Sequence, residues 1–255
     1  MNNGDGTFTD QAVERGVAYA WNAVGAAAAD YDNDGDTDMV FTVMTNFPAL
    51  LVNTGSGYFA TVAVTNSLLL PAYVDDDGTP IIEWGEINRY TSPSWGDLNN
   101  DGFLDLVFGR WRGFSIDALY FYVQVSGALV ETQVMDEDSE NNFLFTPGFA
   151  DMDSDGWSDL LTVGDFSNSH VHVNSLTGTV RRVVGSGTGT DQNGMGTAIG
   201  DYDNDGDLDW FVTSIEDPLT NLVTIGKWGN TGNRLYRNEG EFNFSDITTE
   251  AGVRL

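Results

Sequence analysis

The stretch Asp30-Tyr-Asp-Asn-Asp-Gly-Asp-Thr-Asp38 carries an acidic residue at every second position, with a glycine directly after the third. The same nine-residue frame returns as Asp97-Leu-Asn-Asn-Asp-Gly-Phe-Leu-Asp105, Asp151-Met-Asp-Ser-Asp-Gly-Trp-Ser-Asp159 and Asp201-Tyr-Asp-Asn-Asp-Gly-Asp-Leu-Asp209. Four copies in one register indicate a repeat protein, in which each copy belongs to one structural unit. We call the four copies loops one to four, in the order of the chain, and we count the nine positions of each loop from its first Asp.

The alternating oxygen ligands suit a hard cation, and calcium takes about six to eight oxygens at about 2.3–2.6 Å. The glycine at position six of each loop permits a sharp bend, including φ > 0. Magnesium is the weaker candidate because it dehydrates reluctantly. The alternative without an ion is that Asp, Asn and Gly simply form acidic turns. Four copies in one register, each with acidic side chains that would repel one another, favour the metal.

The frame is similar to the calcium loop of an EF-hand, but its surroundings differ. An EF-hand needs a bidentate Glu at position twelve and a helix on each side. The twelfth positions here are Phe41, Phe108, Thr162 and Val212. The remaining acidic ligand is then the Asp at position nine. Each loop also leads into a short β-prone apolar segment, such as Met39–Val43, and follows small residues, such as Gly25–Ala29. These flanks predict a β-hairpin with the loop at its tip.

The segments around each loop predict a unit of four strands. The expected strands are at 23–29, 38–44, 49–53 and 58–64; 92–96, 105–110, 117–125 and 128–134; 146–150, 159–164, 170–174 and 178–184; and 196–200, 209–214, 233–237 and 242–248. Successive loops begin 67, 54 and 50 residues apart. This period predicts an all-β fold, a β-propeller of four-stranded blades. A β-solenoid is the structural rival, but its repeats are usually much shorter than about 50 residues.

No linker divides the chain, so we expect a single domain over residues 1–255, with blades at about 18–66, 91–140, 141–190 and 191–255. Residues 1–17 follow nearly the same pattern as residues 238–253. They are expected to be the outer strand of a preceding blade. An insertion around 66–90 accounts for the long first spacing. Its acidic segment, and a similar one at 136–140, are expected to be solvated turns, with a partner surface as the alternative.

The composition limits the function classes. The chain has 255 residues, a formal net charge of −29 and no cysteine. The charge argues against binding nucleic acid or an anionic membrane, and the lack of cysteine excludes disulfide, redox and zinc–thiolate chemistry. The first residues show no signal peptide and no apolar run reaches membrane-spanning length. Calcium can replace disulfides as the stabilising element outside cells, where its concentration matches weak loops.

No catalytic motif accompanies the repeats. The two histidines, His170 and His172, alternate on one strand and are expected to lie on a polar strand face; a zinc or acid–base pair is the alternative. Arg110-Trp-Arg-Gly113 and Lys227-Trp-Gly-Asn230 are expected in loops, as partner contacts. The alternative is that Trp111 and Trp228 pack between blades. We therefore expect that the chain is not an enzyme.

Two stretches resemble a known family: Gly194–Thr213, and Asn233–Gly240 followed by Phe244–Val253. They resemble FG-GAP/VCBS repeats, best known from the propeller of integrin α-subunits, and most closely the cartilage acidic protein and ASPIC/UnbV branch. The resemblance covers essentially the whole chain. It implies a seven-bladed parent, so that a chain of four blades with an extra first strand would be a fragment or a truncated product. A closed four-bladed ring is the alternative.

The resemblance also implies calcium in each loop, about four ions in total. The side chains at positions one, three, five and nine would be ligands, and position seven would contribute its backbone carbonyl. By that pattern the ligand residues are Asp30, Asp32, Asp34, Asp36 and Asp38; Asp97, Asn99, Asp101, Phe103 and Asp105; Asp151, Asp153, Asp155, Trp157 and Asp159; and Asp201, Asp203, Asp205, Asp207 and Asp209. Loop two departs from the pattern at Asn99 and Phe103, so it is expected to bind most weakly.

The expected function is that of a non-catalytic, calcium-binding β-propeller acting as an extracellular or cell-surface adhesion or protein-interaction scaffold. Its partner would be a protein or a glycan, with no nucleic-acid binding and no membrane insertion. The alternative is a carbohydrate-binding propeller module of a secreted hydrolase or lyase.

Overall fold

The computed structural model describes residues 1–18, 23–43, 48–62, 90–111, 119–125, 128–132, 143–215 and 231–253. These residues form four antiparallel sheets of four strands, each in sequence order. Blade one contains β1 (Ala23–Ala29), β2 (Asp38–Val43), β3 (Ala49–Asn53) and β4 (Phe59–Val62); blade two β5 (Tyr90–Gly96), β6 (Asp105–Arg110), β7 (Leu119–Val125) and β8 (Ala128–Thr132); blade three β9 (Leu144–Ala150), β10 (Asp159–Gly164), β11 (His170–Asn174) and β12 (Val180–Arg182); and blade four β13 (Gly194–Gly200), β14 (Asp209–Ser214), β15 (Arg234–Asn238) and β16 (Phe244–Asp246). The all-β prediction is confirmed.

The predicted strands differ from the observed ones mainly at two kinds of position. β5, β9 and β13 begin two residues earlier than expected, because each continues across a register shift in its pairing with the next strand. A β-bulge breaks the two-residue alternation on which the prediction rests. The outer strands β12 and β16 are shorter than predicted. An edge strand has only one neighbour to hydrogen-bond with, so pairing ends sooner.

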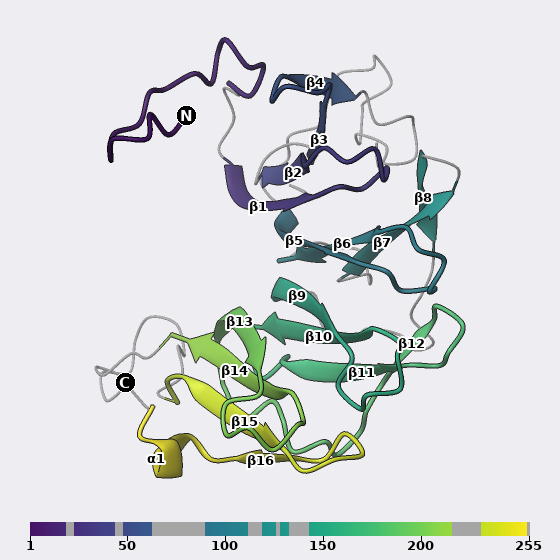
Figure 1. Cartoon of the computed structure of the whole chain (residues 1–255). Helices are drawn as coiled ribbons and strands as arrows, with labels where there is room; N and C mark the ends of the chain where they lie inside the picture. The colour runs from purple at the N-terminus through teal and green to yellow at the C-terminus, as the bar shows by residue number, and fades with distance from the viewer. Residues whose placement is uncertain are drawn as a thin grey trace, which may run out of the picture.

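The blades follow one another along an arc, with blade one at one end and blade four at the other (Figure 1). The first strands lie on the inner side, where β1 contacts β5, β5 contacts β9 and β9 contacts β13. This is a propeller-like arrangement, in which neighbouring sheets pack face to face around an axis lined by their first strands.

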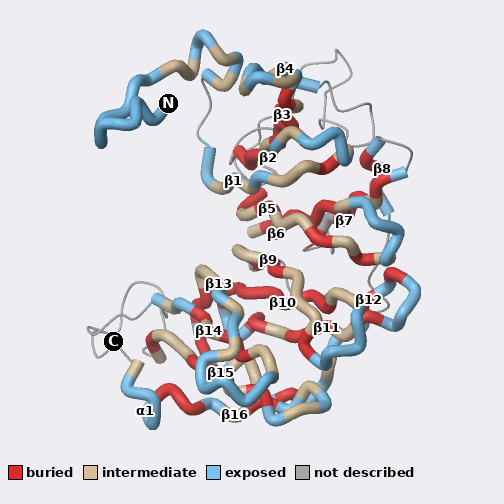
Figure 2. Tube along the Cα trace, viewed as in Figure 1, coloured by how far each residue is buried: buried red, intermediate tan, exposed pale blue. Residues whose placement is uncertain are grey.

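The hydrophobic core lies between the blades, and buried residues are concentrated on the second and third strands (Figure 2). Successive side chains of a strand point to opposite faces, so each second strand supplies two interfaces. In β6, Leu106 and Phe108 pack toward blade one, while Val107 packs toward blade three. In β10, Leu160 faces blade two and Leu161 faces blade four. The run of β-branched and large apolar residues in a second strand therefore packs against both neighbouring blades.

The small residues of the first strands are required by close packing between neighbouring blades. A Cβ on Gly96 of β5 would lie 2.4 Å from the Phe149 ring of β9, and one on Gly25 of β1 would lie 2.9 Å from the backbone of β5. Both distances are shorter than any ordinary contact. Glycine at these positions sets how closely adjacent blades approach.

The ends of the chain differ from each other. Residues 1–17 contain no strand of a sheet, although Asn2 and Phe8 form an antiparallel bridge. The peptide N–H of Phe59 in β4 donates to the Arg15 carbonyl, so this segment lies along blade one. At the other end, β16 is followed by the short helix α1 (Thr248–Ala251).

Some expectations concern residues that the structure does not describe. The acidic segments at 75–78 and 136–140 lie outside the described residues. Within the described ranges, no helix is long and apolar enough to cross a membrane.

Candidate metal centre

The four acidic loops adopt one conformation. Position four has a left-handed backbone in every loop, with φ of 59° at Asn33, 57° at Asn100, 60° at Ser154 and 61° at Asn204. The glycine at position six also has a positive φ in each loop. Two left-handed residues so close together curl the chain tightly, and glycine and asparagine adopt that conformation most readily. The repeated sequence thus encodes a repeated backbone.

The carboxylate at position one organises the curl. In loop one, Asp30 Oδ1 accepts the N–H of Asp34 at 3.0 Å, and Asp30 Oδ2 accepts the N–H of Gly35 at 3.0 Å. The equivalent carboxylates of Asp97, Asp151 and Asp201 accept the same pair of peptide N–H groups. The carboxylate at position five accepts the N–H of position seven in every loop. Backbone donors therefore hold these side chains in place.

The aspartate at position nine is the first residue of each second strand and is buried. In loop three, Asp159 Oδ2 accepts the N–H of Met152 at 2.9 Å, and Asp159 Oδ1 accepts the N–H of Asn174 in β11 at 2.9 Å. Asp38, Asp105 and Asp209 make the equivalent pair of bonds. This side chain connects the loop to the third strand of its own blade, so loop and sheet are one unit.

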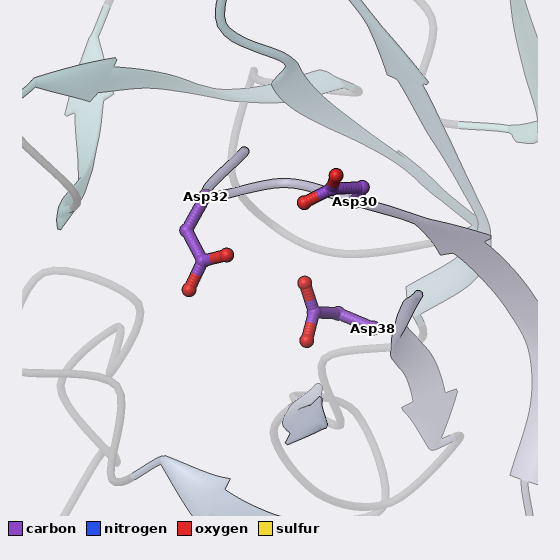
Figure 3. Close-up of side chains that lie close together, drawn as sticks. All are labelled: Asp30, Asp32 and Asp38. Carbon is purple, nitrogen blue, oxygen red and sulfur yellow. The ribbon is translucent and has the colours of Figure 1, made fainter. Parts of the chain in front are cut away.

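Carboxylate oxygens converge in three of the loops. One oxygen from each of Asp30, Asp32 and Asp38 lies within 4.8 Å of the other two, and Figure 3 shows the three side chains around a common space. The same three positions converge in loops three and four, as Asp151, Asp153 and Asp159, and as Asp201, Asp203 and Asp209. Oxygens bound to one calcium ion, each at about 2.3–2.6 Å, are separated by at most about 5 Å. The spacing therefore fits one cation per loop.

Asp32 provides a separate test of that fit. Its Oδ1 atom is buried and has no hydrogen-bond partner. A buried carboxylate oxygen without a donor is unfavourable unless a cation accompanies it. The donor set, all carboxylate oxygen, is the set that calcium prefers.

Burial and mutual repulsion also disfavour the ionised loops when no cation is present. Burial, followed by the charge of Asp34, raises the pKa of Asp32, and burial followed by the charge of Asp155 raises that of Asp153. Burial raises the pKa of Asp105 to about 6 and that of Asp159 to about 7, although two backbone donors oppose the shift in each case. A bound divalent cation would reverse this balance, because it favours the charged form of every carboxylate around it.

In loops one, three and four the structure brings together the carboxylates at positions one, three and nine of the predicted ligand set. The converging groups do not include the side chains of position five, which are engaged with the N–H of position seven. Loop two has the same fold, but its third position is Asn99, whose Oδ1 accepts the N–H of Asp101. At these three positions loop two has only two carboxylates, Asp97 and Asp105, and the weaker site expected there stays a prediction.

Two predictions outside the loops need correction. His172 is 4% exposed and does not lie on a polar strand face. Its Nε2 lies 3.2 Å from the Thr162 hydroxyl, and burial lowers the pKa of His172 to about 3. Arg110 was expected both as the last residue of a strand and, with the residues after it, in a loop of partner contacts. It is the buried last residue of β6, so its strand placement is confirmed and its placement in a loop is wrong. In both cases an inward-facing strand position, invisible in the local pattern, buries a polar side chain.

The predicted partner contacts are only partly described. Trp111 is half-buried and packs near Phe143 and Phe145, with ring centroids 6.0 Å away in each case. This supports the interpretation in which it packs between blades. Residues 112–113 and 227–230 lie outside the described part of the chain.

The sequence interpretation missed a set of amide side chains at the ends of the third strands: Asn53, Gln124, Asn174 and Asn238. The last three donate to the position-two carbonyl of the preceding loop, at Tyr31, Leu98 and Met152. A signal was present, since an Asn or Gln precedes each Gly-containing turn after the third strand. Its role could not be read without the packing of adjacent blades.

One comparison with known protein families agrees with this architecture. The sequence profile of the FG-GAP-like repeat matches residues 1–41 and 151–212, which supports the repeat and propeller family. No curated protein matches the chain. Among solved structures, a lectin of Agrocybe aegerita, described as specifically recognising non-reducing terminal N-acetylglucosamine, is 14% identical over 96% of this chain and 72% of its own, with a TM-score of 0.47. That likeness is too distant to bear on what this chain binds.

Proposed function

We propose that this chain is a non-catalytic, calcium-binding β-propeller module that serves as an extracellular adhesion or protein-interaction scaffold. The observation that supports it most strongly is the convergence of three carboxylate oxygens within 4.8 Å in each of three loops. The resemblance to the cartilage acidic protein and ASPIC/UnbV branch belongs to the same proposal.

In this proposal calcium is structural. When bound, the ion supplies positive charge that neutralises the crowded carboxylates of a loop. The protein's own part is to present those carboxylates. Position one is held by two peptide N–H groups, and position nine is held by the backbone of the third strand. Binding would therefore stabilise the first hairpin of a blade and its attachment to the third strand together.

The absence of catalysis is part of the proposal and is supported by the state of the buried polar groups. Ser169, which precedes a histidine in the sequence, is fully buried, and its hydroxyl donates to Asp191 Oδ2 at 2.7 Å. Asp191 Oδ1 accepts the Tyr236 hydroxyl at 2.9 Å. This network is satisfied internally between blades three and four and offers no exposed nucleophile. An extracellular location is supported by calcium loops suited to millimolar calcium.

Thermal unfolding in saturating calcium, in magnesium and in excess EDTA tests the metal. A ligand that binds only the folded state raises the midpoint by mass action, so calcium should raise it well above the EDTA value and magnesium should raise it less. An identical midpoint in calcium and EDTA would overturn the proposal.

A second candidate function, carbohydrate binding, is favoured by one cluster. Trp111, Phe143 and Phe166 lie together where blade two meets blade three, with Phe166 55% exposed. The Trp111 indole N–H donates to Asp165 Oδ2, while Asp165 Oδ1 is buried without a hydrogen-bond partner. Aromatic faces beside a carboxylate suit a sugar ring. A glycan array with the native protein and with Phe166→Ala would test this: signals lost in the variant support it, and a blank array for the native protein rejects it.

A further inference from the structure

Neighbouring acidic loops are joined directly through the residue at position four. The Asn33 side-chain amide of loop one donates from Nδ2 to the Gly102 carbonyl of loop two, at 3.0 Å. Asn100 of loop two does the same to the Gly156 carbonyl of loop three, at 2.9 Å. Because position four has the same left-handed backbone in every loop, its side chain leaves the loop in the same direction each time.

The third boundary lacks this bond. Loop three has Ser154 at position four, and within the described residues no hydrogen bond joins Ser154 to loop four. A serine hydroxyl is shorter than the asparagine amide, so it does not span the same gap. The difference is one side chain in an otherwise repeated backbone.

The accepting carbonyl lies in the peptide that shapes the next site. In loop two, the Gly102 N–H donates to Asp97 Oδ2 and the N–H of the following residue, Phe103, donates to Asp101 Oδ1, both at 2.9 Å. Asn33 therefore fixes the peptide between positions six and seven, whose N–H orients the carboxylate at position five. Asn100 fixes the equivalent peptide of loop three, where the N–H of Trp157 donates to Asp155 Oδ1 at 2.8 Å.

A second set of bonds is common to all three boundaries and does not explain the difference. Gln124, Asn174 and Asn238 each donate to the position-two carbonyl of the preceding loop. These buried bonds hold adjacent blades together irrespective of position four. The exposed loop-to-loop bond, in contrast, is present at the first two boundaries and absent from the third in the described residues.

We propose that Asn33 and Asn100 couple cation binding in loops one, two and three, and that Ser154 leaves loop four coupled more weakly to loop three. This inference rests on the proposed calcium function. Binding in one loop orders its position-four side chain, and that side chain then holds the next loop in its binding conformation. Coupling is reciprocal, so each loop of a pair gains affinity by the same factor. One exposed hydrogen bond corresponds to a coupling of about two- to tenfold.

Hydrogen exchange measured by mass spectrometry during a calcium titration gives a midpoint for each loop separately. The natural serine of loop three supplies the substitution: Asn33→Ser should raise the midpoint of loops one and two by about two- to tenfold. Ser154→Asn should lower the midpoints of loops three and four by a similar factor. Asn204→Ser is the matched control, because Asn204 has the same backbone φ of 61° and donates to no other loop in the part of the chain that the structure describes; it should affect loop four alone.

Each outcome decides one of the two proposals. The first outcome is calcium-dependent protection in the native protein with unchanged midpoints in the variants. If loop two has the same midpoint in native and Asn33→Ser proteins, and loop four has the same midpoint in native and Ser154→Asn proteins, the coupling is overturned while the calcium sites remain. No calcium-dependent protection in any loop of the native protein would overturn the calcium function and the coupling with it. Opposite shifts in the two variants, with only a local effect of Asn204→Ser, are the expected result.

Discussion

Replacement of Asp32 by Asn removes one negative charge from loop one while keeping the size of the side chain. Its Oδ1 has no hydrogen-bond partner, so the substitution breaks no bond at that atom. Its carboxylate lies within 4.8 Å of those of Asp30 and Asp38. At that distance a pair of charges repels by about 1 kcal/mol at the dielectric constant of water and by about 3.5 kcal/mol at an effective value near 20. Because Asp32 is half-buried, we use the lower figure for each pair.

The expected effect of Asp32→Asn changes sign with calcium. In EDTA, relief of repulsion should raise the free energy of unfolding by about 1–2 kcal/mol. In calcium at about 100 times the dissociation constant, loss of the site removes about 2.7 kcal/mol, so the net change is a decrease of about 1–2 kcal/mol. A change of 1 kcal/mol moves the midpoint by about 2–4 °C in a chain of this size. Differential scanning fluorimetry in both media resolves such shifts.

Asp36→Asn is the matched control, since it removes the same charge from the same loop. The Asp36 side chain is not in the converging group, so its substitution should shift the midpoint in the same direction in EDTA and in calcium. If Asp32→Asn lowers the midpoint equally in both media, or behaves like Asp36→Asn, then a cation is not held between Asp30, Asp32 and Asp38, and the reasoning is wrong.

Three further predictions concern packing and pH. Asn238→Ala removes the buried amide that joins blade four to blade three and leaves carbonyl groups unpaired, so urea unfolding should show a loss of about 1–3 kcal/mol; an unchanged midpoint would contradict this role. Gly96→Ala places a Cβ 2.4 Å from an aromatic ring and should cost about 1–3 kcal/mol, whereas Gly200→Ala, which meets nothing within 4 Å, should be nearly neutral; equal effects would refute the close approach of the first strands. In EDTA, the pKa values of Asp105 and Asp159 stand at about 6 and about 7, above the ordinary 3.8. The folded state then binds more protons than the unfolded chain between about pH 4 and pH 7, so the free energy of unfolding should fall as pH rises through that interval. Urea titrations at about pH 5 and about pH 7 in EDTA check the sign, and a rise with pH would contradict it.

The acidic loops were predictable because their determinants are local. Asp30 accepts N–H groups only four and five residues ahead, and nine contiguous residues contain the whole curl. Strand positions were equally accessible, since alternation and the fixed distance from each loop locate the second strands: β6, β10 and β14 begin and end where the sequence places them. The starts of β5, β9 and β13 could not be predicted from the sequence, because a bulge interrupts the alternation there.

The sequence by itself determined the number of loops, their oxygen-rich side chains and the repeated four-stranded unit, because each depends on residues that are neighbours in the chain. Tertiary structure decided what joins the units. Asn33 reaches a carbonyl 69 residues away and Asn238 one 86 residues away, and His172 is buried although its strand pattern predicts a polar face. Such contacts depend on which faces of two blades meet and at what distance, and small residues such as Gly96 set that distance. No local pattern contains that information, because it arises only when separate blades are packed against one another.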